Sequence, residues 1–146
     1  MNADKCKSMT GYVFLAREGA IMWNLRTQES HALSSTGAEY VALAEAVHEV
    51  CWLRNLYMEL GLLRGELPTV IKGDNKGSLS MVRNPQYHKH SKHIDLQWHW
   101  ICELIRNGVV TVESVHDLEQ TADVLTKALL QERHQKHTKG MGLISI

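Results

Sequence analysis

The sequence predicts a mixed α/β fold in which helices cover a sheet. Three observations support this class: a hairpin pattern near the N-terminus, apolar stripes with helical spacing, and short β-rich runs between the helical segments. The predicted order is strand, strand, helix, strand, helix, helix, strand, helix. A hairpin followed by alternating elements favours one mixed sheet with packed helices.

The first two strands are predicted at residues 11–15 and 21–25. Their sequences, GYVFL and IMWNL, are rich in β-branched and aromatic residues, and the turn sequence REGA at 17–20 lies between them. Two such runs joined by a short turn indicate an antiparallel hairpin. The polar run over 26–36 then leads into the first helix.

The first helix is predicted from about Ala38 to about Leu60, with Gly61 ending it. Steps of four and three residues define one stripe along it: Glu39, Leu43, Ala46, Val50 and Leu53. The stripe is apolar except at its start. Either Glu39 closes a capping box with Thr36 and only starts the helix, or its carboxylate is directed toward a ligand.

Periodicity and helix breakers predict the other elements: strand 69–72, helix 76–82, helix 91–107, strand 109–115 and helix 118–130. Asn84-Pro85 ends the short helix, and Gly108 ends the longer one. Residues 131–146 are polar with little periodicity and are expected to fray. The sequence therefore predicts one domain over 1–130 and a polar C-terminal tail over 131–146.

The composition sets limits on the classes of function. Sixteen basic residues balance sixteen acidic ones among 146, so a nucleic-acid site must come from local clustering of charge. Three widely spaced cysteines fit neither a disulfide framework nor a CxxC-type zinc site. We expect a reducing, intracellular setting, cytoplasmic or nuclear, since no apolar run is typical of a signal peptide or a membrane span.

Three acids lie at the ends of predicted elements. Glu39 begins a helix, Asp74 directly follows a strand, and Asp123 lies in the first turns of the last helix. Each has a structural explanation as well: Asp74 as an N-cap, and Asp123 as the i,i+4 ion-pair partner of Lys127. Acids at element ends can also converge at one point of a sheet, where mutual repulsion requires a cation. Their hard oxygen ligands suit Mg²⁺.

The segment YHKHSKHID, residues 87–95, concentrates histidine and lysine. A zinc site needs about four N or S ligands, and the segment offers three histidines with no cysteine nearby. A solvated helix entry is the plain structural alternative. We favour a patch that contacts a phosphate backbone, formed by Arg83, Lys89, Lys92 and His93.

Four motifs carry a resemblance to a known family: TGYVFL, SSTGAEYVALAEA, GDNKGSLSMVRNPQYHKHSKHID and VTVESVHDLEQTADVLTKAL. In this order they resemble the ribonuclease H domain of Ty1/copia-type retrotransposon polyproteins. The resemblance extends from about Ser8 to Leu129 without a large gap. Single departures are Gly37, where the family usually has Glu, and Ala128, where it usually has Pro.

The resemblance implies a ribonuclease H-like mixed five-stranded sheet with helices on both sides. It also implies hydrolysis of the RNA strand of an RNA–DNA hybrid by four carboxylates with two Mg²⁺ ions. By motif, the family's catalytic set includes Glu39, Asp74 and Asp123. This order of acids argues against an integrase, in which the Glu comes last. Glu39 would then approach metal.

The resemblance also implies that the first, central strand and its catalytic Asp are missing. In the family this Asp lies in a DAD-like stretch well upstream of the glycine of GYVF, and Gly11 is too close to Met1 for that; Asp4 matches a linker position. We therefore expect reduced Mg²⁺ occupancy and impaired cleavage. An upstream polyprotein segment or a second chain would supply the strand.

Three functions stay open at this point: a hybrid nuclease, a non-catalytic nucleic-acid-binding remnant of a retroelement, and an inactive folded fragment. His116, shortly before Asp123, is a candidate proton shuttle, although the family usually has Pro there. An in-frame upstream strand carrying an Asp would favour the nuclease.

Overall fold

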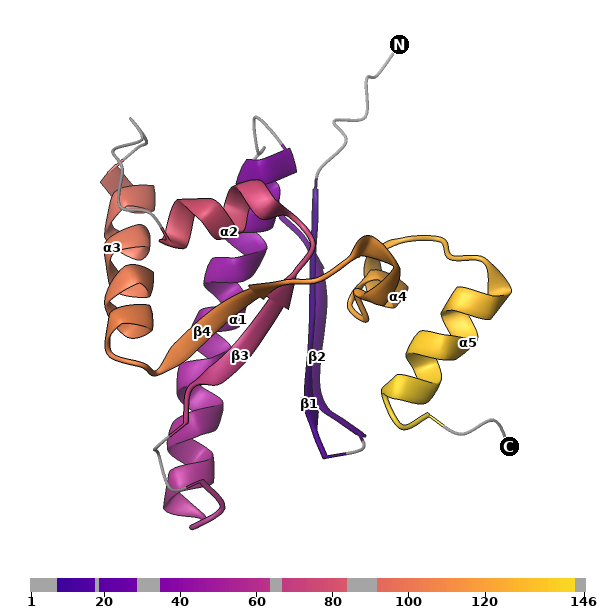
Figure 1. Cartoon of the computed structure of the whole chain (residues 1–146), viewed down its shortest axis with the longest axis horizontal. Helices are drawn as coiled ribbons and strands as arrows, with labels where there is room; N and C mark the ends of the chain where they lie inside the picture. Colours follow the sequence, from indigo (N-terminus) through magenta and orange to yellow (C-terminus); the bar gives the residue numbers. More distant parts are fainter. Residues whose placement is uncertain (1–7, 18, 29–34, 64–66, 84–91, 144–146) are drawn as a thin grey trace. The chain divides into compact units, whose positions relative to one another are not determined.

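A computed structural model describes residues 8–17, 19–28, 35–63, 67–83 and 92–143. These residues form five α-helices, a single-turn 3₁₀-helix and four strands, so the α/β class is confirmed (Figure 1). The chain divides into two compact units. One combines residues 1–38 with 116–146, and the other spans 39–115.

The first unit begins with the predicted hairpin. Strands β1 (Met9–Ala16) and β2 (Gly19–Thr27) pair antiparallel, and both are longer than the apolar runs that predicted them. The predicted turn is correspondingly shorter, and it contains Arg17 with a φ of 55°. Across the hairpin, Asn24 Nδ2 donates a hydrogen bond to Tyr12 Oη over 3.1 Å.

A buried amide joins this hairpin to the segment that enters the first helix. Gln28 is 2% exposed, and its Nε2 donates to Thr10 Oγ1 at 3.1 Å and to the Ala38 carbonyl at 2.9 Å. Because a buried polar group costs free energy unless it is hydrogen-bonded, these two bonds fix where the chain leaves β2. Gln28 therefore has a structural role in the polar run that follows the hairpin.

The C-terminal part of this unit differs from the prediction. The single helix predicted over 118–130 is wrong: the chain forms η1 (Asp117–Glu119) and the short α4 (Asp123–Thr126). The helix is interrupted because Gln120 takes an extended conformation, with φ −75° and ψ 100°. Lys127 is also extended, with φ −124° and ψ 145°, and this ends α4 after one turn.

A helix replaces the frayed tail that was predicted from residue 131 onward. Helix α5 (Gln131–Gly140) is followed by Met141, whose carbonyl accepts a hydrogen bond from the Ala20 N–H over 3.0 Å. Helix α4 lies next to β1 in the same unit (Figure 1). The C-terminal helices are therefore bound to the hairpin at two places.

The second unit contains most of α1 (Ser35–Glu59). The helix begins three residues earlier than predicted, so Thr36 lies inside it and is not the N-cap of a capping box. It ends as predicted before Gly61, which has a φ of 68°. The predicted apolar stripe is confirmed in its middle, where three side chains are buried: Leu43, Ala46 and Val50.

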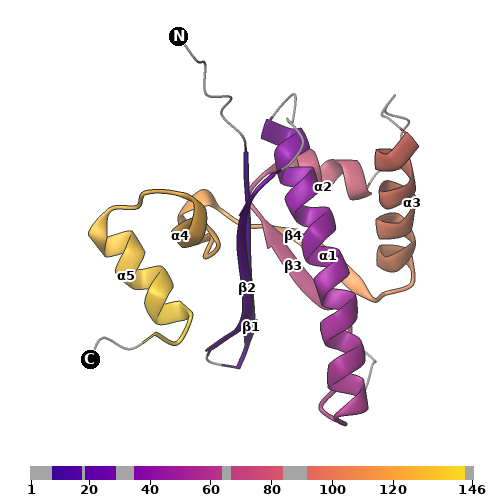
Figure 2. The same cartoon turned by 180° about the vertical axis from the view of Figure 1, so that it is seen from behind.

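Two parallel strands form the sheet of this unit. Strand β3 (Thr69–Gly73) pairs with β4 (Val110–Ser114), with Thr69 opposite Val110. Helix α1 crosses one side of this pair, behind it in Figure 1 and in front of it in Figure 2. The buried Arg54 of α1 donates through Nη1 to the Leu67 carbonyl at 2.8 Å and to Thr69 Oγ1 at 3.0 Å, which places α1 against the start of β3.

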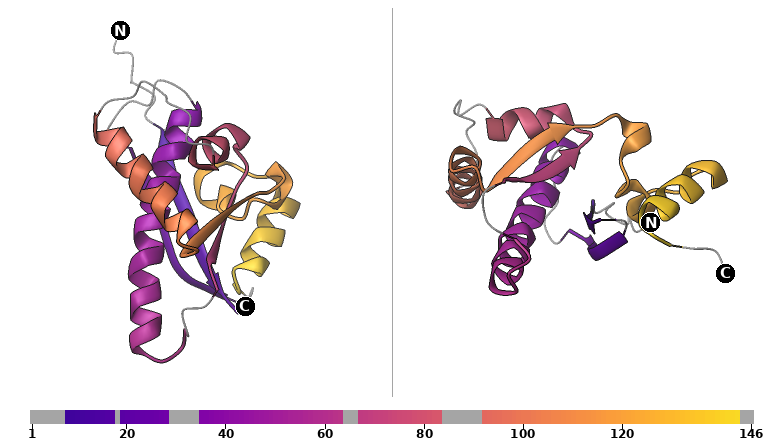
Figure 3. Two further views of the ribbon diagram at one scale, coloured as in Figure 1. Left: turned by 60° about the vertical axis from the view of Figure 1, so that its left-hand side comes forward. Right: turned by 60° about the horizontal axis from the view of Figure 1, so that its bottom comes forward.

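Helices α2 (Lys76–Arg83) and α3 (Lys92–Arg106) complete the unit, close to their predicted bounds. Trp98 Nε1 donates to the Met81 carbonyl over 2.7 Å, which connects α3 to α2. The rings of His48 and Trp100 stack with centroids 4.2 Å apart, and α3 lies beside α1 in Figure 3. Gly108, with a φ of 68°, ends the turn after α3 as predicted.

The predicted single mixed sheet is not what the described residues form. They contain two separate two-stranded sheets, β1–β2 and β3–β4. Strands become one sheet only through backbone pairing, and no described strand pairs with members of both sheets. The ribonuclease H-like five-stranded arrangement stays a prediction.

Candidate metal site

Asp123 is the most buried carboxylate of the described residues. It is the first residue of α4 and is 4% exposed. Its burial follows from the packing of α4 on β1, where the backbone at Gly11 comes close to Leu125 and Thr126. A carboxylate at such depth needs positive charge or hydrogen-bond donors around it.

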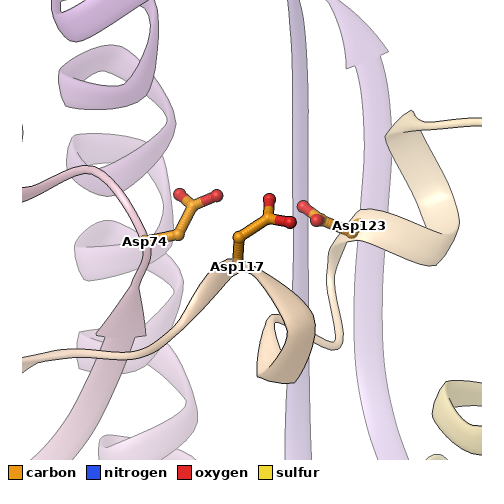
Figure 4. Close-up of side chains that lie close together, drawn as sticks. All are labelled: Asp74, Asp117 and Asp123. Carbon is orange, nitrogen blue, oxygen red and sulfur yellow. The ribbon is translucent and has the colours of Figure 1, made fainter. Parts of the chain in front are cut away.

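A second acid in the same unit faces Asp123. Asp117 opens η1, and Figure 4 shows its carboxylate turned toward that of Asp123. We call these two residues the carboxylate pair. Sequence reasoning missed Asp117 because it lies in the predicted connection between the strand 109–115 and the helix 118–130, where an exposed acid has no evident role. The usable signal was an acid followed six residues later by the predicted metal ligand.

Two cationic side chains neutralise the carboxylate pair. Lys127 Nζ lies 3.0 Å from Asp123 Oδ2 and 3.4 Å from Asp117 Oδ1. Arg133 Nη2 lies 3.6 Å from Asp123 Oδ2 and 3.5 Å from Asp117 Oδ2. The predicted i,i+4 pair of Asp123 with Lys127 is thus confirmed, but its acidic end is buried and not on a solvated face.

Helix α5 is attached to η1 by side chains from both elements. Arg133 Nη2 donates to the backbone carbonyl of Asp117 over 2.9 Å. Lys136 Nζ donates to Glu119 Oε1 over 2.5 Å, and this hydrogen bond lowers the pKa of the Glu119 carboxyl below its usual range. The otherwise polar α5 is thus held by charged contacts with the segment that precedes Asp123.

Asp74 lies in the second unit, directly after β3. It is half-buried, and Figure 4 shows it at the end of that strand. The alternative interpretation of Asp74 as a helix N-cap is wrong, because Asn75 is the N-cap of the helix that begins at Lys76. Its Oδ1 accepts a hydrogen bond from the Ser78 N–H at 3.0 Å. Capping therefore does not explain an acid at this position.

Asp117 and Asp123 of the first unit offer carboxylate oxygens that suit a metal ion, and Asp74 of the second unit is a further candidate ligand. Hard oxygen ligands of this kind are typical of Mg²⁺ sites. Glu39 lies in the first turns of α1, where its side chain is exposed. That Glu39 and Asp74 act together with Asp123 stays a prediction.

The predicted phosphate-contacting residues are only partly described. Arg83 is exposed at the end of α2, and its guanidinium donates to the Val112 carbonyl, so it also has a structural role. Lys92 and His93 lie in the first turn of α3, whereas Lys89 lies outside the described residues. A patch formed by these four residues therefore stays a prediction.

His116, the candidate proton shuttle, caps η1. Its Nδ1 accepts a hydrogen bond from the Leu118 N–H over 3.3 Å, and its side chain is exposed. An accepting Nδ1 places the ring proton of the neutral form on Nε2. The observed role is structural, and a role in proton transfer stays a prediction.

Comparison with known proteins relates the chain to transposon polyproteins. It is 36% identical over 142 residues to the retrovirus-related Pol polyprotein from transposon TNT 1-94 of Nicotiana tabacum, an alignment that covers 97% of this chain. It is 33% identical to the Pol polyproteins from transposons RE2 and RE1 of Arabidopsis thaliana, over 99% and 98% of its length. The chain is a relative of one segment of these Pol polyproteins.

This Pol-related chain spans about a tenth of the length of the curated relatives it matches, since each alignment covers 10% of the polyprotein. A shorter similarity, 45% over 47 residues, relates it to the secreted RxLR effector protein 161 of Plasmopara viticola. No protein-family model and no solved structure matches the chain. Among the described residues, no helix combines the length and the apolar character that crossing a membrane requires.

Proposed function

We propose that this Pol-related chain is a ribonuclease H-type domain that hydrolyses the RNA strand of RNA–DNA hybrids. The observation that carries the proposal is Asp123: a carboxylate that is 4% exposed, at the start of α4, beside a second aspartate and two cations. A purely structural ion pair does not require two acids with overlapping cationic partners. The motif resemblance and the relation to Pol polyproteins support the same assignment.

The donor set fits a hard divalent cation. Lys127 Nζ already lies within 3.4 Å of an oxygen of each member of the carboxylate pair, so a single cation can be shared by both acids. When bound, Mg²⁺ would lower the pKa of a water molecule and stabilise the leaving oxygen of a phosphodiester. Asp123 would hold the metal, and we propose Glu39 and Asp74 as further carboxylates of the catalytic set.

Recognition of the hybrid is proposed to depend on its backbone. The candidate residues are Arg83, Lys89, Lys92 and His93. Contacts of Lys and Arg with phosphates release counterions and carry little sequence preference. This suits an enzyme that must act along a hybrid of any sequence.

The test compares the chain with Asp123→Asn, and with Glu113→Gln as a control for an exposed acid on β4. Mn²⁺ binding and Mg²⁺-dependent cleavage of a labelled RNA–DNA hybrid are measured, with circular dichroism to check folding. We expect Asp123→Asn to lose both properties and Glu113→Gln to keep them. Wild-type chain that binds hybrid but neither binds metal nor cleaves would favour the non-catalytic remnant and refute the proposal.

A further inference from the structure

The two cations beside the carboxylate pair come from different parts of the chain. Lys127 directly follows α4, four residues after Asp123, and its side chain is 47% exposed. Arg133 belongs to α5 and is less exposed, at 27%. Lys127 therefore stays near Asp123 whatever α5 does, whereas Arg133 stays there only while α5 is docked.

The guanidinium of Arg133 has partners at Nη2 and none at Nε among the described residues. Its Nη2 donates to the Asp117 carbonyl and lies within 3.6 Å of both carboxylates. Its Nε is buried without a hydrogen-bond partner among the described residues. A buried donor without a partner is unfavourable, so the attraction of the carboxylate pair is what retains the guanidinium. If another cation neutralised the pair, this attraction would be lost.

A divalent cation and the guanidinium would compete for the negative charge of the same two carboxylates. Arg133 approaches Oδ2 of both Asp117 and Asp123, and a metal bound by the pair would bring its positive charge to the same oxygens. Two cations this close repel each other, and solvent screens the repulsion least at the Asp123 carboxylate, whose side chain is 6% exposed. Occupation by one therefore weakens the other.

We propose that Arg133 is a built-in competitor for the metal, so that metal binding by the carboxylate pair displaces Arg133 and loosens α5. The inference rests on the metal site of the proposed function and adds a regulatory element to it. In the metal-free chain, α5 is closed onto η1. Conversely, any partner that draws α5 away would raise metal affinity, because coupling between two binding events is reciprocal.

The test uses two matched variants of α5. Arg133→Met removes the competing charge while keeping a long side chain, and Lys136→Met removes the other α5–η1 contact, which involves Glu119 and neither member of the pair. Mn²⁺ affinity is measured by titration with electron paramagnetic resonance. We expect Arg133→Met to bind Mn²⁺ about three- to tenfold more tightly than wild type. Lys136→Met weakens the docking of α5 but leaves Arg133 beside the carboxylate pair, so its gain in affinity should be clearly smaller.

A second measurement follows α5 directly. Amide hydrogen exchange over residues 131–140 should accelerate in wild type when Mg²⁺ is added, and should be fast with and without Mg²⁺ in Arg133→Met. Unchanged exchange on saturation with metal would overturn the proposal. A merely structural Arg133 would give the opposite affinity result, since loss of packing would weaken the site.

The outcomes separate this inference from the proposed function. Metal binding by wild type that is lost in Asp123→Asn, with equal or weaker binding by Arg133→Met, would leave the metal site in place and refute the competition. No metal binding by wild type or by Arg133→Met would refute both. Metal binding by Arg133→Met but not by wild type would support the competition, because Arg133 would then exclude the metal completely.

Discussion

Gly11 of β1 and Thr126 of α4 are in such close contact that a Cβ atom on Gly11 would overlap Thr126 Cγ2. The absence of a side chain at Gly11 is therefore what lets α4 lie on β1. Because Asp123 begins α4, the same contact sets the depth of its carboxylate.

Gly11→Ala should consequently displace α4 and move Asp123 out of its buried position. We expect a loss of about 1–3 kcal/mol in the free energy of unfolding, as is usual for overpacking, together with weaker Mn²⁺ binding. Urea denaturation and metal titration measure the two effects. Gly19→Ala is the matched control, since the atom nearest to a Cβ there would be the Met141 carbonyl oxygen, at an ordinary 3.9 Å. Equal effects of the two substitutions would contradict this account.

The contact between Lys136 and Glu119 predicts a pH dependence of α5. The Lys136 hydrogen bond lowers the pKa of Glu119 below its ordinary value of 4.5, so the folded state favours the ionised carboxylate. A lowered folded-state pKa contributes stability above the unfolded value, and that stability is lost as the pH falls through the folded-state value. The contribution is therefore fully present above the ordinary value of 4.5 and is lost progressively as the pH falls below it and through the lowered folded-state value.

Hydrogen exchange of α5 at constant temperature, corrected for the intrinsic rate, should show this loss in wild type. In Lys136→Met the protection that depends on Glu119 should be missing at every pH, so the acid transition of α5 should be smaller. Glu132→Gln, which changes an acid of α5 itself, should keep the transition. An acid transition of the same size in Lys136→Met would show that another group controls it.

The local elements were predictable where a single residue or a short pattern decides the backbone. The hairpin follows from two apolar runs, and two helix ends follow from Gly61 and Gly108, which both take a positive φ. The break between η1 and α4 was not predictable in this way. It depends on the His116 side chain as a cap and on the extended conformation of Gln120.

The site was predictable in part for the same reason. Asp74 and Asp123 were predicted from their positions at the ends of elements, since acids there can converge; that they act together stays a prediction. Asp117 and Arg133 were missed because their contact joins η1 to α5, and α5 lacks the apolar periodicity that predicts a helix. A polar helix held by ion pairs gives little signal before the tertiary contacts are known.

Salt dependence tests the predicted phosphate contacts. Affinity for an RNA–DNA hybrid should fall steeply as salt rises, because each phosphate contact releases counterions. Replacing Lys89 and Lys92 together by Ala should make the plot of log affinity against log salt less steep. The magnitude of its slope should fall by about 0.7–0.9 for each phosphate that is no longer neutralised. The control replaces two basic residues of α5 outside the proposed patch, Lys136 and Lys139, by Ala. An unchanged slope in the first double variant would mean that this segment is only a solvated helix entry.

The number of strands leads to the last prediction. Each described sheet has two strands, fewer than the five that the family resemblance implies, and sheets of two strands are marginally stable. The resemblance also assigns only three of four catalytic carboxylates to these 146 residues. We therefore expect weak Mg²⁺-dependent hybrid cleavage by residues 1–146 alone. Adding upstream sequence that contributes one strand with an Asp should raise both the midpoint of urea unfolding and the cleavage rate.

The added strand has two separable effects, and two variants distinguish them. An extension whose Asp is replaced by Asn should restore the unfolding midpoint without restoring cleavage, because pairing uses the backbone whereas metal binding uses the side chain. Asp74→Asn in the extended chain should lower cleavage while leaving the strand paired. Efficient cleavage by residues 1–146 that disappears in Asp74→Asn would show instead that these carboxylates suffice without the additional strand.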